Sequence, residues 1–247
     1  MGQPKAARVE TLSRTLAQRG VLHLREAAIL LGVSEMTIRR DVAANRDQFA
    51  YLGGHIVSAA DVAGEGYVLD LEAGSHAEAK AAACAHAAGL IAPEDTIFLD
   101  CGTTIPFLAD KLPSDMPLTV ICYALNVANR LAVKPNVRMI LLGGLYHASS
   151  ASLVGDDAAQ TMDRYGINKA FMSAGGVDAM RGVSCSHFHE VPVKKKAIST
   201  AMESYLVVDG SKIGRVRPAV FAAISDFRAV ITEAGVMPAA VLGETGT

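Results

Sequence analysis

The sequence predicts an α/β protein in which a small N-terminal winged helix-turn-helix precedes a larger parallel-sheet α/β domain. Three short helical patterns and a Gly-Gly pair occupy residues 1–58, and short apolar runs alternate with helical patterns from residue 96 onward. The charge also changes sign, because residues 1–58 hold eight Lys and Arg against five Asp and Glu, whereas residues 59–247 hold fifteen against twenty. A basic N-terminal segment followed by an acidic C-terminal segment indicates two domains with different binding partners.

The composition excludes several classes of protein. Hydrophobic residues make up 51% of the 247 residues and charged residues 19%, which suffices for a buried core. The four cysteines are scattered and form no Cys-x-x-Cys pair, so neither a disulfide framework nor a zinc site is expected. The chain has no apolar leader and no uncharged run of transmembrane length. We therefore expect a cytoplasmic protein with no membrane partner and no cofactor.

Apolar residues at helical spacing predict the first two helices. In the first helix these residues are Val9, Leu12 and Leu16. In the second they are Leu24, Ala27, Ala28 and Leu31. Gly20 stands where the first helix would end, and Gly32 ends the second and begins the turn of a helix-turn-helix arrangement.

A third helix is predicted to begin at Ser34 and to present a polar outer face. The Ser34 hydroxyl is a favourable N-cap, and Glu35 places a negative charge at the positive end of the helix dipole. Ile38 and Val42 are four residues apart and define the buried stripe. The outward and flanking positions are then Met36, Thr37, Arg39 and Arg40. On an isolated helix such a face is more often simply solvated.

A hairpin after the third helix makes DNA binding the favoured interpretation of that face. Two extended runs, 49–52 and 55–58, flank Gly53-Gly54 and predict a tight turn between two strands. Three helices and a hairpin form a winged helix, in which the outer face of the third helix enters the major groove. The expected contacts to double-stranded operator DNA are Arg25, Ser34, Met36, Thr37, Arg39 and Arg40.

The domain boundary is expected where the sequence is small and weakly patterned. Residues 59–74 have this character and are interpreted as a linker. A DNA-binding domain at 1–58 then precedes it, with the helix-turn-helix at 22–41. An effector-binding and oligomerisation domain at 75–247 follows it.

Strands and helices alternate through the second domain. Ser75 and Glu78 predict a capping box for an alanine-rich helix that runs to about Gly89. Six apolar runs then predict strands at 97–99, 118–123, 137–142, 169–173, 205–208 and 229–232. Helical patterns such as 156–164 and 193–203 separate most of these runs. The alternation predicts a parallel sheet with helices on both faces.

Polar loops follow four of the predicted strands. They read Asp-Cys-Gly-Thr-Thr at 100–104, Gly-Gly at 143–144, Ala-Gly-Gly-Val-Asp at 174–178 and Asp-Gly-Ser-Lys at 209–212. Ligands of open parallel sheets bind at the carboxyl ends of the strands. A glycine, two hydroxyls and free backbone N–H groups before a helix near Pro106 suit a phosphate. Each loop alone is better explained as a turn, but the four together favour a small phosphorylated ligand.

Signals for other chemistry are weak. The sequence has no Gly-x-Ser-x-Gly elbow and no Walker loop, so hydrolase and nucleotide-kinase functions lack support. His187 and His189 lack the carboxylate pattern of a metal site, and no metal is expected. In the run 194–196, only one lysine can easily face a pocket. Cys101 and Cys185 are better explained as small buried fillers than as reactive thiols.

Most of the chain resembles the DeoR family of bacterial transcriptional repressors. The segment from Leu22-His23-Leu24-Arg25-Glu26 to Thr37-Ile38-Arg39-Arg40-Asp41 resembles the helix-turn-helix of that family. The four strand-end loops are similar to its effector-binding domain, and the likeness runs from about Arg8 to about Thr232. The segments 122–126, 146–149 and 190–194 are most similar to the branch of the family that controls deoxyribose catabolism.

The resemblance implies a homo-oligomeric repressor that a phosphorylated sugar releases from operator DNA. It further implies deoxyribose 5-phosphate as the inducer and genes of deoxyribonucleoside catabolism as the target. The effector contacts are expected at Asp100, Gly102, Thr103, Thr104, Gly143, Gly175, Asp178, Lys194 and Lys212. The hydroxyls and amides of 102–104 would hold the phosphate, the two lysines would neutralise it, and the two aspartates would bind sugar hydroxyls.

The same resemblance implies an alternative function. The second domain of the family is similar in fold to ribose 5-phosphate isomerase, so a sugar-phosphate isomerase stays open as the rival interpretation. Lys194 stands where the glutamate base of that enzyme would align, and a shift of a few residues would bring Glu190 there. An ammonium group cannot take a proton from a sugar carbon. Because a complete winged helix precedes the domain, we expect a sensor and no enzyme.

Overall fold

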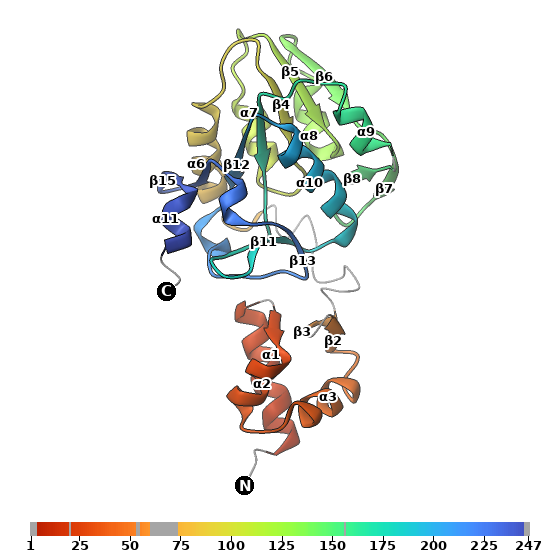
Figure 1. Ribbon diagram of the computed structural model, residues 1–247. Coiled ribbons are helices and arrows are strands. Elements are labelled where there is room, and N and C mark those ends of the chain that lie inside the picture. The colour runs from red at the N-terminus through yellow and green to blue at the C-terminus, as the bar shows by residue number, and fades with distance from the viewer. Residues whose placement is uncertain (1–3, 20, 53–54, 60–73, 156, 245–247) are drawn as a thin grey trace.

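The computed structural model describes residues 4–19, 21–52, 55–59, 74–155 and 157–244. A small helical unit at the N-terminus lies beside a larger α/β unit (Figure 1). The small unit contains α1 (Lys5–Arg19), α2 (Leu24–Leu31) and α3 (Glu35–Ala43), with the strands β1 (Val21–His23), β2 (Phe49–Leu52) and β3 (His55–Ser58). The predicted winged helix-turn-helix is confirmed.

The small unit has a core of its own. Apolar side chains from all three helices and the strands meet there, among them Leu12, Leu24, Ile38, Phe49 and Ile56. Gly32 ends α2 in the left-handed conformation, with φ of +63°, as the glycine at that position predicts. Asp41 of α3 is buried and accepts hydrogen bonds of 2.7 and 3.1 Å from the Arg8 guanidinium of α1. This two-point ion pair fixes α3 against α1.

The wing contains one strand more than the sequence predicts. The order of its sheet is β1-β3-β2, and both pairings are antiparallel. The additional strand, β1, lies directly before α2 and was not predicted, because three residues carry too little pattern to reveal a paired strand. The predicted turn at Gly53-Gly54 lies outside the described residues.

The larger unit is built on a seven-stranded sheet in the order β15-β14-β12-β9-β4-β5-β6. Its strands are β4 (Thr96–Leu99), β5 (Leu118–Cys122), β6 (Val137–Leu141), β9 (Lys169–Met172), β12 (Glu203–Val207), β14 (Ala229–Thr232) and β15 (Gly235–Pro238). All six predicted runs form strands that pair in parallel with their neighbours. Only β15 is antiparallel, and it was not predicted.

Helices cover both faces of this sheet. They are α6 (Ala77–Ala88), α7 (Ile105–Lys111), α8 (Leu125–Leu131), α9 (Ala158–Met162), α10 (Val191–Thr200) and α11 (Ala239–Glu244). From β4 the chain passes through α7 to β5, and from β9 it passes through α10 to β12. Because β5 and β12 lie on opposite sides of the β4–β9 pair, the sheet extends in opposite directions from this pair. Right-handed crossovers therefore place α7 and α10 on opposite faces.

Two details of the predicted helices are wrong. The capping box of Ser75 and Glu78 does not form, because His76 adopts a left-handed conformation with φ of 52° and α6 begins at Ala77 without a side-chain cap. The helical pattern at 193–203 also extends too far. α10 ends at Thr200, and Glu203 already begins β12.

Two small sheets lie outside the main one. β7 (Leu145–His147) and β8 (Ser152–Val154) form a hairpin, and β10 (Gly176–Asp178), β11 (Gly182–Cys185) and β13 (Ala219–Ala222) form an antiparallel sheet. The described part of this unit also contains the short 3-10 segments η1 (Phe188–Glu190), η2 (Gly210–Lys212) and η3 (Ile224–Asp226). Strands of three or four residues carry too little pattern to be predicted.

Candidate DNA interface and effector site

The N-terminus of α3 is capped as the sequence predicts. The Ser34 hydroxyl accepts a hydrogen bond of 3.2 Å from the Thr37 backbone N–H and lies 3.0 Å from the Thr37 hydroxyl. Ile38 and Val42 are buried. Because Ser34 and Thr37 are hydrogen-bonded to each other, both residues stabilise the N-terminus of α3.

The outer face of α3 is open to solvent. Met36 is 59% exposed, and Arg40 is exposed beside it. Arg39 lies differently, because its guanidinium sits 4.7 Å from the centre of the Tyr51 ring in β2. A cation held over an aromatic ring keeps its charge but loses freedom. The structure therefore separates the two neighbouring arginines into one that is held against the wing and one that projects outward.

Two further arginines surround this face. Arg25 is exposed at the start of α2, where its backbone N–H donates to the His23 imidazole. Arg46, which sequence reasoning missed, lines a groove between α3 and the wing together with Arg39 and Tyr51. Its position after the helix gave no periodic signal.

The predicted effector loops meet where the two halves of the sheet diverge. Asp100 directly follows β4 and Ser173 directly follows β9, and the two strands are neighbours. The Asp100 carboxylate accepts hydrogen bonds of 2.7 Å from the Ser173 backbone N–H and 2.7 Å from the Tyr123 hydroxyl. This is the switch point of the sheet, the position at which open α/β sheets bind their ligands.

A buried ion pair lies beside this switch point. The Lys194 ammonium of α10 is 1% exposed, donates to Asp100 at 2.5 Å and lies 3.6 Å from Glu190. Burial opposes the charge on Lys194, but the two carboxylates outweigh it and hold its pKa well above the ordinary value. Lys194 was expected to neutralise a phosphate. The structure instead pairs it with two carboxylates, and Asp100 is likewise occupied by protein groups.

Three side chains hold the loop 101–104 in place. The buried Lys80 ammonium of α6 donates to the Thr103 hydroxyl at 3.1 Å, the Asn126 amide donates to the Gly102 carbonyl at 2.9 Å, and the Ser173 hydroxyl donates to the Cys101 carbonyl at 2.8 Å. Lys80 was not among the predicted effector residues. Its signal is a single lysine among eight alanines in α6, and the pattern alone does not say which way that side chain turns.

A small cavity joins the loops. Its lining comes from the strand ends, η1, α10 and the segment after η2: Cys101, Gly102, Thr103, Thr104, Ser173, Ala174, Gly175, Cys185, Ser186, His187, Glu190, Lys194, Lys212 and Arg217. A Cβ atom on Gly175 would lie 2.8 Å from the Arg217 side chain, so glycine allows Arg217 to cross this loop. The cavity measures about 40 Å³, far below the roughly 300–1,000 Å³ of typical small-molecule sites. A sugar phosphate can enter only if a wall moves.

Two predicted effector residues lie elsewhere. Gly143 lines a different cavity beside α9, where its neighbour Gly144 packs against the backbone of 154–155. Asp178 accepts hydrogen bonds from the backbone N–H groups of Met180 and Arg181 and so closes the β10–β11 turn. Six other expected residues line the cavity: Gly102, Thr103, Thr104, Gly175, Lys194 and Lys212. Asp100 is buried behind this lining, where it bonds Ser173 and Lys194.

A thiol and an imidazole lie close to carboxylates at the cavity. Burial raises the pKa of the Cys101 thiol well above its ordinary value, and neighbouring carboxylates add to this effect. His187 and Glu190 are 3.2 Å apart. Among the described residues, no three His, Cys, Asp or Glu side chains gather as metal ligands would.

The acid stability of the protein should depend on Glu190. Burial opposes its ionisation, but Lys194 and His187 outweigh burial and lower the pKa of the carboxyl from 4.5 to about 2. A depressed pKa stabilises the fold above the unfolded value and loses that effect as pH falls through the folded value. Glu190→Gln should therefore cost about 3 kcal/mol at pH 7, and the difference should vanish between pH 4.5 and 2. Urea unfolding of both proteins between pH 7 and pH 2 measures this stability difference, and Glu78→Gln, at an exposed site, is the control. A cost that does not change with pH would contradict the assignment.

The two units define a class of protein, a helix-turn-helix transcriptional regulator with a ligand-sensing domain. A model of the DeoR-like helix-turn-helix domain matches residues 8–51, and a model of the DeoR C-terminal sensor domain matches residues 75–234. The chain belongs to the DeoR family. No described helix is long and apolar enough to cross a membrane.

Curated relatives match along nearly their whole length. The chain is 40% identical over 226 residues to the deoxyribose operon repressor of Escherichia coli K12, covering 92% of this chain and 89% of that protein. It is 29% identical to the transcriptional regulator IolR of Bacillus subtilis, covering 92% and 91%, and 30% identical to the lactose phosphotransferase system repressor of Streptococcus mutans, covering 93% and 92%.

Solved structures with a similar fold are remote in sequence. Ribose 5-phosphate isomerase A from Methanocaldococcus jannaschii superposes with a TM-score of 0.43 at 18% identity, covering 56% of this chain and 55% of that one. The eIF2B beta subunit of Chaetomium thermophilum superposes with a TM-score of 0.48 at 16% identity, covering 68% and 52%.

Proposed function

We propose that this protein represses a deoxyribose or deoxyribonucleoside catabolic operon and that deoxyribose 5-phosphate releases it from the operator. In this proposal the protein is a cytoplasmic homo-oligomer whose winged helices bind operator half-sites. Arg40 and Met36 face the base edges, while Arg25, Arg39 and Arg46 face the backbone. Support for the target comes from the 40% identity to the deoxyribose operon repressor, which extends over both domains.

The cavity at the switch point is the observation that carries the effector proposal. Thr103 and Thr104 supply hydroxyls on one wall, while Lys212 and Arg217 supply positive charge on the other. An anionic group between these walls would meet hydrogen-bond donors on both sides. The buried Lys194 then acts as a positioning residue that orients Asp100 and Glu190, and not as the main phosphate contact.

The wall that carries the cationic side chains also touches the winged helix. Val216 lies between Lys212 and Arg217 and packs against Val57 of β3, with Ala50 of β2 beside it. Because the cavity is too small for a sugar phosphate, entry of the effector would displace this segment. Its displacement would disturb the contact with the wing, and an effector that favours the displaced state lowers operator affinity by its difference in affinity for the two states.

A thermal shift tests the choice of effector. Deoxyribose 5-phosphate at one hundred times its Kd should stabilise the protein by about 2.7 kcal/mol, which raises the Tm by roughly 5–11 °C for a protein of this size. Ribose 5-phosphate should act more weakly because its additional 2-hydroxyl must be accommodated. Lys212→Gln should reduce the shift, and Lys111→Gln, at an exposed site on α7, should leave it unchanged. The absence of a shift with any pentose phosphate would refute the effector assignment.

The isomerase alternative has a direct test of its own. We propose that the protein is not an enzyme, because the carboxylate nearest the cavity, Glu190, is held ionised beside Lys194 with a pKa of about 2 and makes a weak base. Incubation with ribose 5-phosphate should yield no ribulose 5-phosphate. Sustained turnover that Glu190→Gln abolishes would favour the isomerase.

A further inference from the structure

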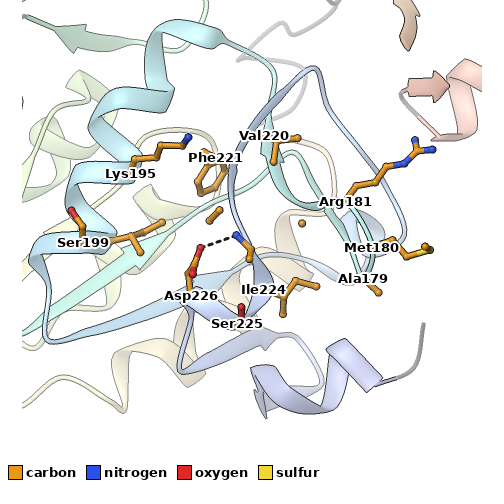
Figure 2. A pocket seen from close by; sticks show the side chains of 14 residues that line it. Ala179, Met180, Arg181, Lys195, Ser199, Val220, Phe221, Ile224, Ser225 and Asp226 are labelled. Atoms are coloured by element: carbon orange, nitrogen blue, oxygen red, sulfur yellow. Dashed lines mark hydrogen bonds between the residues drawn. The ribbon is translucent and has the colours of Figure 1, made fainter. Parts of the chain in front are cut away.

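A large groove lies on the sensor domain apart from the effector cavity. It has a volume of about 840 Å³ and runs between α10, the β10–β11 turn, β13 and η3. Figure 2 shows Lys195 and Ser199 projecting from one side, Val220 and Phe221 in the middle, and Met180 with Arg181 on the opposite side. The groove has an apolar floor and charged edges, which is the character of a protein-docking surface.

Helix α2 presents an uncovered apolar face in the other domain. Ile29 is 75% exposed and Leu30 is 50% exposed, although the opposite stripe of the helix fills the core of the winged helix. Glu26 precedes these residues by three and four positions, so all three side chains share one face of the helix. The fold of the winged helix leaves this face without an apolar partner among the described residues.

An ion pair already joins this face of α2 to the rim of the groove. The Arg181 guanidinium donates to the Glu26 carboxylate at 2.8 Å across 155 residues of sequence. Arg181 is part of the groove lining, and the exposed Met180 lies beside it. The Glu26 and Arg181 charges therefore form one contact between the two surfaces, while the apolar residues of α2 stay exposed.

We propose that the groove is the docking surface for the outer face of α2 of the same chain. In the docked state Ile29 and Leu30 pack against Val220 and Ile198, and the Glu26–Arg181 ion pair orients α2 toward the groove. This inference rests on the proposed function, because docking withdraws Arg25 at the start of α2 from the DNA backbone. Docking and operator binding therefore exclude each other.

The groove and the effector cavity share structural elements, so a ligand bound in the cavity can change how α2 binds in the groove. Lys194 faces the cavity, while its neighbour Lys195 lines the groove on the same helix. The Lys194 ammonium also lies 5.0 Å from the centre of the Phe221 ring, which lines the groove. An effector that moves α10 or β13 changes the shape of both sites at once. Occupancy of the cavity is thereby linked to docking of α2.

A disulfide cross-link tests the docking in the full-length protein. Ile29→Cys with Val220→Cys should form an intramolecular disulfide in the DNA-free protein, and oxidation of the native thiols should contribute little because all four are buried. Saturating operator DNA should reduce the yield by roughly fivefold or more, and deoxyribose 5-phosphate should restore it. The matched control is Leu145→Cys with Val220→Cys, because Leu145 is 71% exposed on the β7–β8 hairpin.

Each outcome bears on one proposal. A cross-link no stronger than that of the control overturns the docking, and so does a disulfide that joins two chains. If the intramolecular disulfide forms but a gel-shift assay detects no DNA binding, the docking stands and the proposed repressor function fails. If the disulfide forms and responds to DNA but not to deoxyribose 5-phosphate, the docking stands and only the effector assignment fails.

Discussion

Arg40→Ala is expected to abolish specific operator binding while the protein stays folded. Arg40 is exposed on the outer face of α3, and no hydrogen bond or ion pair of the fold engages its guanidinium among the described residues. A bidentate contact from arginine to a base pair contributes roughly 1–3 kcal/mol. Its loss should weaken binding by roughly 5- to 150-fold at each half-site, and the losses multiply when two half-sites are bound. The Tm should stay within about 2 °C, since surface substitutions seldom exceed 0.5 kcal/mol.

A gel-shift titration measures this effect against a duplex that the protein selects from a random pool. Arg14→Ala is the matched control, because Arg14 is exposed on α1. Arg46→Ala should weaken specific and non-specific binding alike and reduce the salt slope by about one, as expected for a phosphate contact. Undiminished operator affinity of Arg40→Ala would show that another face of the winged helix binds DNA.

Lys194→Met is expected to destabilise the sensor domain severely. The substitution removes the cation between Asp100 and Glu190 and leaves two buried carboxylates without their partner. Breaking a buried ion pair by removing one member costs about 3–5 kcal/mol, which corresponds to a decrease in Tm of roughly 6–20 °C. The loss of unfolding free energy should be smaller at acidic pH, because the unpaired Asp100 and Glu190 carboxylates then take up protons and lose their charge.

Lys195→Met is the control, since it changes the same residue type one position along α10 at an exposed site. It should alter the free energy of unfolding by less than about 0.5 kcal/mol. Calorimetry at pH 7 compares the two variants with the parent protein. Equal stability of Lys194→Met and the parent would mean that the Asp100–Lys194 pair does not hold the switch point together.

The recognition helix was predictable because its signals are local. The Ser34 cap, the Ile38–Val42 stripe and the glycine that ends α2 each depend on a few neighbouring residues. The split between Arg39 and Arg40 was not predictable, because it requires the position of the Tyr51 ring. Local pattern predicts which side chains face outward, whereas tertiary contacts decide which of them are already engaged.

The effector site was predictable in outline for a different reason. In a parallel sheet every strand delivers its carboxyl end to the same edge, so the loops after β4 and β9 were expected at one edge of the sheet. That Asp100 meets Ser173 follows from the pairing of β4 with β9, which the sequence did not predict. The loop of Gly143 follows the edge strand β6, and Asp178 closes the turn of the β10–β11 hairpin, so neither reaches the cavity. Lys80 enters from a helix, and no pattern in an alanine-rich segment reveals it.

Anisotropy of a labelled operator duplex during titration with deoxyribose 5-phosphate tests the central claim most directly. The claim is that a sugar phosphate bound at the β4–β9 switch point controls the affinity of α3 for operator DNA. The expected result is release of the operator over the same concentrations that raise the Tm, with Lys212→Gln requiring more effector for both. Operator that stays bound at concentrations that saturate the thermal shift would contradict the claim.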